Sequence, residues 1–365
     1  MAKLPLIIRF LGKLVLGRKN PPLPALPQKG RWYRVNMPGH VASDGSEYGF
    51  DMRFGSENRL IVYLHGGGMS WDEHMAAHPS SLDGDTDDMY YTPRAGHCKG
   101  TKGLFSLGKE NPFRNWSIIS LPYCTGDFHC GRADFPYTAS DGIRKTLYHH
   151  GYDNTVDAIA EAVRHLPTPE KLMICGNSAG GFGASFMADT IIDLFPECGD
   201  ITVYNDSAFF IRKDWVHIVR DVWNAPEAVW NNVKTENAVL DSLLALKEKR
   251  PQVKLMFSCS TRDYNISIIE GYDEVGKLIP KREYGDHMER NLAAMCDGLA
   301  DAGIFIFDIP ASGREGELGF TKHCIAIDSE AAAAAVDGAN TLQWLWDGVN
   351  GRQKKYGLDK LGETN

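Results

Sequence analysis

The sequence lacks several features that would place the protein in other classes. It has no excess of basic residues, since 39 Lys and Arg stand against 47 Asp and Glu. A protein whose main partner is nucleic acid normally has a basic face, so we expect no such partner. The chain also has no internal repeat, no low-complexity block and no apolar run long enough to cross a bilayer. What remains is a chain of 365 residues that can bury a large core.

A disulfide framework and a metal-ligand pattern are also missing. The eight cysteines do not have the spacing of a small secreted domain, and they stand at positions 98, 124, 130, 175, 198, 259, 296 and 324. This usage favours reduced, buried thiols in a cytoplasmic protein, although the sequence leaves open whether Cys124 and Cys130 pair. Near these two, Asp127 and His129 have no second cluster of ligand residues to complete a zinc site. We therefore predict no metal and no cofactor.

The first 30 residues differ from the remainder. Residues 1–30 combine an amphipathic segment with a Pro-rich linker, and residues 31–365 are expected to form a single catalytic domain. Arg9 and Lys13 interrupt the apolar run and no cleavage site follows, which disfavours a cleaved signal peptide. A helix here would dock onto the body of the protein, with peripheral contact of residues 3–19 with a membrane surface as the alternative. The sequence does not indicate the oligomeric state.

The body of the chain alternates apolar runs of strand length with helical patterns. The runs cover residues 58–68, 115–124, 171–176, 200–206, 253–260 and 304–310. The helical patterns cover residues 152–166, 179–195, 238–250 and 287–303. Such alternation predicts an α/β protein with a mainly parallel central sheet flanked by helices. Functional side chains on such sheets gather at the carboxyl ends of the strands.

One strand end contains the motif G-x-S-x-G. In the stretch "ICGNSAGGFG", Gly176, Ser178 and Gly180 lie between a predicted strand and a predicted helix, which is the context of a nucleophilic serine on a sharp turn. A serine that only caps the helix is the alternative. The "HGGG" stretch after another strand makes Gly67 and Gly68 candidate oxyanion donors, together with the backbone of Ala179.

A base and an acid are expected later in the chain, in the order Ser, Asp, His. His323 follows the last apolar strand, whereas the competing histidines His65, His129 and His287 precede it. Asp263 follows the penultimate strand and is the preferred acid. Asp206 also ends a strand and remains a rival, although we expect it to support the loop behind the nucleophile.

These motifs together resemble the pectin acetylesterase family. The resemblance depends on "LHGGG", "PYCTGDFHCG", "GNSAGGFGA", "NDSAFF", "STRD" and "KHC", which follow in order from about Leu60 to His323. It implies an α/β-hydrolase-like fold and a metal-independent mechanism. The matching positions are Ser178, Asp263 and His323 for the triad, and Gly67, Gly68 and Ala179 for the oxyanion hole.

We therefore predict a serine carboxyl-ester hydrolase that removes short acyl groups, such as acetyl, from a small-molecule or carbohydrate carrier. A serine peptidase, a long-chain lipase or protein deacylase, and a catalytically silent binding module with this fold are the alternatives. Four residues are further candidates for substrate contact, although each could equally pack a loop: Trp71, Asp127, His129 and Phe209.

Overall fold

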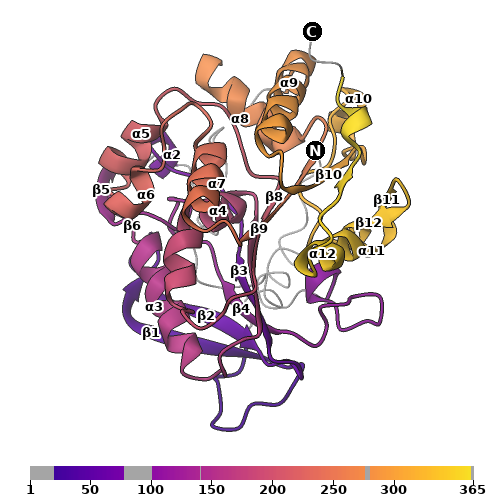
Figure 1. Cartoon of the computed structure of the whole chain (residues 1–365). Helices are drawn as coiled ribbons and strands as arrows, with labels where there is room; N and C mark the ends of the chain where they lie inside the picture. The colour runs from indigo at the N-terminus through magenta and orange to yellow at the C-terminus, as the bar shows by residue number, and fades with distance from the viewer. Residues whose placement is uncertain (1–19, 78–100, 140, 276–279, 363–365) are drawn as a thin grey trace, which may run out of the picture.

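A nine-stranded sheet forms the centre of the molecule (Figure 1). The computed structural model describes residues 20–77, 101–139, 141–275 and 280–362. The strand order is β1-β2-β4-β3-β7-β8-β9-β10-β13. The strands are β1 Trp32–Val41, β2 Glu47–Arg53, β3 Arg59–Leu64, β4 Ser117–Leu121, β7 Lys171–Asn177, β8 Ile201–Asp206, β9 Lys254–Ser260, β10 Gly303–Phe307 and β13 Lys355–Tyr356.

All neighbouring strands from β4 to β13 are parallel, and only β1 and β2 pair antiparallel with their neighbours. The six predicted runs correspond to β3, β4, β7, β8, β9 and β10. The predicted fold, a mainly parallel sheet flanked by helices, is therefore confirmed.

Helices cover both faces of this sheet (Figure 1). The longer helices are α3 Gly151–Val163, α4 Ala179–Asp193, α7 Ala238–Lys249, α8 Tyr264–Val275, α9 Arg282–Gly298 and α12 Thr341–Val349. Short helical turns are α2 Glu73–Ala77, η2 Gly103–Phe105, α5 Trp215–His217, η3 Ile218–Val222, α6 Glu227–Trp230, α10 Arg314–Glu317, α11 Glu330–Ala333 and η4 Leu358–Lys360. Two hairpins lie outside the main sheet, formed by β5 Ala133–Thr138 with β6 Arg144–His149 and by β11 Ala335–Val336 with β12 Ala339–Asn340.

Alternate residues of a central strand pack into different cores. Val62 and Leu64 of β3 belong to the core beneath α3, α4, α7 and α9. Ile61 and Tyr63 belong to the opposite core, which includes residues of η2 and α12. Because successive side chains of a strand point to opposite faces, a strand buried on both sides is apolar along its whole length. This is why the inner strands stand out in the sequence as continuous apolar runs.

The predicted amphipathic segment of residues 3–19 lies outside the described residues. In the described ranges, no helix has the length and hydropathy needed to cross a membrane.

Candidate active site

The candidate nucleophile lies on a strained turn between β7 and α4. Ser178 has φ 52° and ψ −129°, a conformation that side-chain-bearing residues rarely adopt. A Cβ atom at Gly176 would lie 2.1 Å from the carbonyl oxygen of Gly180, and one at Gly180 would lie 2.0 Å from the carbonyl oxygen of Leu64. The two glycines of the motif are therefore required by close backbone contact, and they allow the turn to pack against β3. The Ser178 side chain is left half-buried at the end of the strand.

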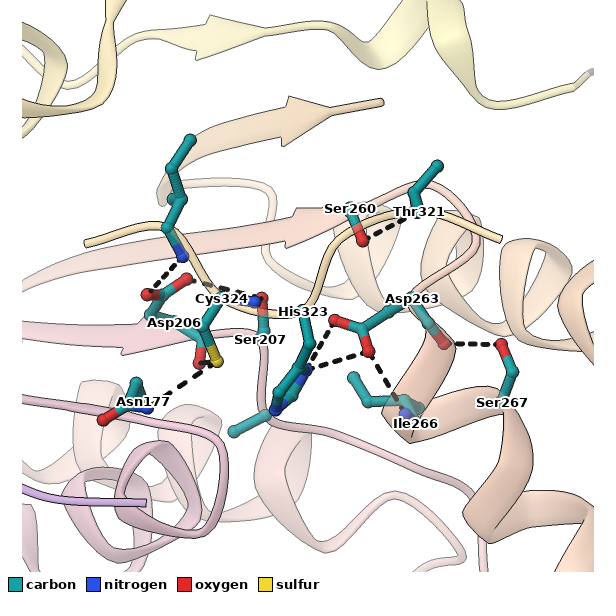
Figure 2. Close-up of polar contacts among 12 residues, drawn as sticks. Asn177, Asp206, Ser207, Ser260, Asp263, Ile266, Ser267, Thr321, His323 and Cys324 are labelled. Carbon is teal, nitrogen blue, oxygen red and sulfur yellow. Dashed lines mark hydrogen bonds and ion pairs between the residues drawn. The ribbon is translucent and has the colours of Figure 1, made fainter. Parts of the chain in front are cut away.

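The candidate base and acid contact each other directly (Figure 2). The Nδ1 atom of His323 lies 2.8 Å from both carboxylate oxygens of Asp263. Asp263 is fully buried, and its Oδ1 also accepts from the backbone N–H of Ile266 at 3.2 Å. The contact at Nδ1 places the basic lone pair of a neutral ring at Nε2. This Nε2 atom is buried and has no hydrogen-bond partner among the described residues.

The electrostatics of His323 follow from that contact. Burial opposes protonation of the ring, but the neighbouring Asp263 carboxylate outweighs burial and raises the pKa of His323 well above its ordinary value. The ring therefore accepts a proton more readily than a free imidazole.

Asp206 connects the serine turn to the loop that contains His323. Its carbonyl oxygen accepts from the Ser178 N–H at 2.9 Å, and the Cys324 thiol lies 3.8 Å from the same oxygen. Its carboxylate accepts the N–H groups of Ile325 at 3.0 Å and Ala326 at 2.8 Å. Cys324, the residue after the candidate base, and Ser178, the candidate nucleophile, thus both contact the carbonyl oxygen of Asp206.

The two candidate acids, Asp206 and Asp263, make different contacts in the structure. Asp206 is fully buried and contacts the backbone beyond His323, whereas Asp263 contacts the imidazole itself. Burial raises the pKa of the Asp206 carboxyl, against the lowering effect of the hydrogen bonds that it accepts. Asp206 therefore has the geometry of a loop support, on the histidine side as well as behind the serine.

The candidate oxyanion donors lie next to the serine turn. A Cβ atom at Gly66 would lie 2.3 Å from the Asn177 carbonyl oxygen and 2.8 Å from the Ser178 Cβ, so the glycine loop contacts the turn closely. The N–H groups of Gly67 and Gly68 donate to no acceptor in the described part of the chain. Ala179 is the first residue of α4, where N–H groups lack partners within the helix.

The four further candidates for substrate contact all lie in the interior. Asp127 is fully buried and accepts four hydrogen bonds, from Thr125 Oγ1 and from the N–H groups of His129, Gly131 and Gly151. The buried His129 ring bonds to the His65 carbonyl at 2.9 Å, and burial lowers the pKa of His129. The Asp127 carboxylate thus holds the loop between β4 and β5, and the His129 ring connects this loop to the residue before the glycine loop.

The two aromatic candidates also pack inside the protein. Phe209 is fully buried, with its ring centroid 6.1 Å from that of Phe257. Trp71 is 8% exposed and lies beneath the Arg212 guanidinium, 4.4 Å from the ring centroid. Of the four candidates, the structure thus brings none into contact with Ser178 or His323 through a described hydrogen bond or ring contact.

The described cysteines are all free and buried, including Cys124 and Cys130. Cys98 lies outside the described residues. Among the described side chains, no group of three or more His, Cys, Asp or Glu could hold a metal ion.

Sequence reasoning missed Asn177 as a functional candidate. Its side chain accepts from the Tyr63 hydroxyl at 2.8 Å and from the Gly66 N–H at 3.2 Å. Position 177 is a variable position of the G-x-S-x-G motif. Its place directly before Ser178 was therefore the only feature of the sequence that could have indicated a functional role.

Comparisons with known proteins agree with this architecture. The crystal structures of the Wnt deacylase Notum from Drosophila superimpose with TM-scores of 0.65 and 0.63, at 19% and 18% identity. They cover 88% of this chain, and 94% and 93% of the Notum chains. The likeness shows that the fold is α/β-hydrolase-like.

Sequence comparison identifies the family. The palmitoleoyl-protein carboxylesterase notum1a of Danio rerio is 24% identical over an alignment of 194 residues, and the alignment covers 47% of this chain. The aligned part spans only 34% of that relative's length. The sequence model of the family described as Pectinacetylesterase matches residues 34–269, a range that includes Ser178 and Asp263 and ends before His323. Because this match covers more than half of the chain, the chain belongs to the pectinacetylesterase family.

Proposed function

We propose that the protein is a serine carboxyl-ester hydrolase that uses Ser178, His323 and Asp263. His323 Nε2 takes the proton of the Ser178 hydroxyl while the Ser178 oxygen attacks the ester carbonyl. The Asp263 carboxylate accepts the Nδ1–H, holds the required tautomer and stabilises the imidazolium. His323 then protonates the leaving alcohol, and the acyl group remains on Ser178. Water, deprotonated by His323, attacks this acyl-enzyme, and the acid leaves as Ser178 recovers its proton.

The negative oxygen of both tetrahedral intermediates faces the N–H groups of Gly67, Gly68 and Ala179. The N–H groups of Gly67 and Gly68, which donate to no acceptor in the described part of the chain, support this assignment. Donors of this kind typically contribute about 2.7 to 4 kcal/mol each to the stability of the transition state.

The single observation that supports the proposal most strongly is the His323–Asp263 contact, which leaves Nε2 buried and without a hydrogen-bond partner among the described residues. We propose a short acyl group such as acetyl on a small or carbohydrate carrier, because the family is described as Pectinacetylesterase. The name of the zebrafish relative supports a second candidate, a long-chain protein deacylase.

A fluorophosphonate probe and a series of esters test these proposals. The probe should label wild-type protein and leave Ser178→Ala unlabelled, since the serine oxygen displaces fluoride only when a base activates it. Hydrolysis of p-nitrophenyl esters from acetyl to palmitoyl should be fastest at the short end. Fastest hydrolysis of the palmitoyl ester would favour the deacylase, and an unlabelled, inactive wild type would favour the silent binding module.

The raised pKa of His323 predicts the acidic limb of the pH profile. The ring accepts the serine proton only when it is neutral, so activity is lost as pH falls through the pKa of His323. Because Asp263 raises this pKa, kcat/KM for p-nitrophenyl acetate should rise with a midpoint above about 6.5, the ordinary value for histidine. In Asp263→Asn the midpoint should move down, measured on the residual activity. A wild-type midpoint at or below the ordinary value contradicts this prediction.

A further inference from the structure

Asn177 lies between the two loops that flank Ser178. It is the last residue of β7, and its half-buried side chain precedes the serine turn. Figure 2 shows its amide directed toward Cys324, the residue after His323. The other end of the amide faces the glycine loop after β3.

The amide oxygen of Asn177 holds the glycine loop. It accepts the Gly66 N–H at 3.2 Å and the Tyr63 hydroxyl at 2.8 Å. The orientation of the amide is fixed chemically, because a backbone N–H can only donate and therefore requires the oxygen on that side. Burial raises the pKa of Tyr63 well above its ordinary value, so this hydroxyl keeps its proton and donates. Gly66 is covalently joined to Gly67, the first proposed oxyanion donor.

The amide nitrogen of Asn177 faces the histidine loop. Nδ2 lies 3.8 Å from the Cys324 sulfur, a long contact to a weak acceptor. Cys324 is itself held by its N–H to Ser207 Oγ at 3.2 Å and by its thiol to the Asp206 carbonyl at 3.8 Å. One side chain therefore contacts the loop of the proposed oxyanion donors and the residue next to the proposed base.

We infer that Asn177 is a positioning residue, which sets the glycine loop and the His323 loop relative to Ser178. The inference rests on the proposed function. The amide suits this role because it offers an acceptor at one end and a donor at the other, whereas an apolar side chain offers neither. A displacement of about 1 Å at reacting groups lowers rates by roughly 10²-fold. Because the loops act on the transition state rather than on ground-state binding, removal of the amide should change kcat more than KM.

The test compares Asn177→Ala with Tyr63→Phe, which keeps the amide but removes one of its two donors. For p-nitrophenyl acetate, Asn177→Ala should lower kcat by roughly 10²-fold with KM within about twofold of wild type. Tyr63→Phe should lower kcat by a smaller factor. The double variant should be no slower than Asn177→Ala, since Tyr63 acts through the amide. Tyr33→Phe is the matched control, because Tyr33 is a buried tyrosine at the sheet edge whose hydroxyl accepts the Gln28 N–H, and its kcat should equal that of wild type.

Fluorophosphonate labelling separates failure of this inference from failure of the proposed function. A labelled wild type with an Asn177→Ala variant that keeps wild-type kcat overturns the inference alone. The inference alone is also overturned if Asn177→Ala changes KM but not kcat. It is likewise overturned if the kcat losses of the two single variants multiply in the double variant. If Asn177→Ala does not fold, a Tyr63→Phe variant with unchanged kcat overturns the inference and one with lowered kcat and unchanged KM supports it. A wild type without labelling or hydrolysis overturns both.

Discussion

Ser178→Ala and His323→Ala should each lower kcat by roughly 10⁶-fold, and the double variant should be scarcely slower than either single variant. The two side chains act as a unit, because the serine is a weak nucleophile without a base and the base has no proton to take without the serine. Once one is lost, the other contributes nothing further. The residual rate should still exceed the uncatalysed rate, since the N–H groups of the glycine loop remain in place.

Controls for this pair come from residues of the same type away from the site. Ser242→Ala removes a buried hydroxyl that bonds to the Ala238 carbonyl within α7. His217→Ala removes an exposed ring that pairs with Asp221. Both should keep wild-type kcat in p-nitrophenyl acetate assays. Near-normal turnover by His323→Ala would show that another group is the base.

Asp263→Asn should fold and lower kcat by up to about 10⁴-fold, while Asp206→Asn should remain active and become less stable. An amide at position 263 can donate to Nδ1 and so favours the tautomer whose Nε2 carries a proton and cannot serve as base. Asp206 contacts backbone N–H groups instead of the ring, so its replacement weakens the support of the loop after His323. A disturbed buried hydrogen bond of this kind lowers the free energy of unfolding by on the order of 1 to 3 kcal/mol.

Two measurements on each variant decide between the acids. We expect the thermal midpoint to fall mainly in Asp206→Asn and kcat to fall mainly in Asp263→Asn. The reverse pattern would make Asp206 the acid of the triad and Asp263 a loop residue.

The inner strands were predictable because burial on both faces makes them continuously apolar. The outer elements were not. β1 contains Pro38 and Gly39, β5 contains Pro136, and β13 has only two residues, so none gives the signal of a strand. Their pairing is decided by the neighbouring strand, which local sequence does not specify.

The candidate triad was predicted from chain order, and its His323–Asp263 contact is present in the structure. The candidates for substrate contact could not be judged in the same way. Sequence alone does not distinguish a carboxylate that faces a substrate from one such as Asp127, whose oxygens are all used by the protein's own donors. Asn177 was missed for the opposite reason, because a variable motif position gives no hint that its side chain connects two loops.

The contacts of Asp206 also bear on the order in which the proposed site is assembled during synthesis. Chains emerge from the ribosome N-terminus first at about 5–20 residues per second, so β7, Ser178 and β8 are available well before the segment that contains His323. Until that segment arrives, Asp206 lacks the Ile325 and Ala326 N–H groups that satisfy its buried carboxylate. A nascent chain that ends before this segment thus has Ser178 without its proposed base, and its Asp206 Oδ2 atom lacks both of these N–H donors. Under the proposed mechanism, Ser178 therefore acquires its base only after residues 323–326 have been synthesised and have packed against Asp206.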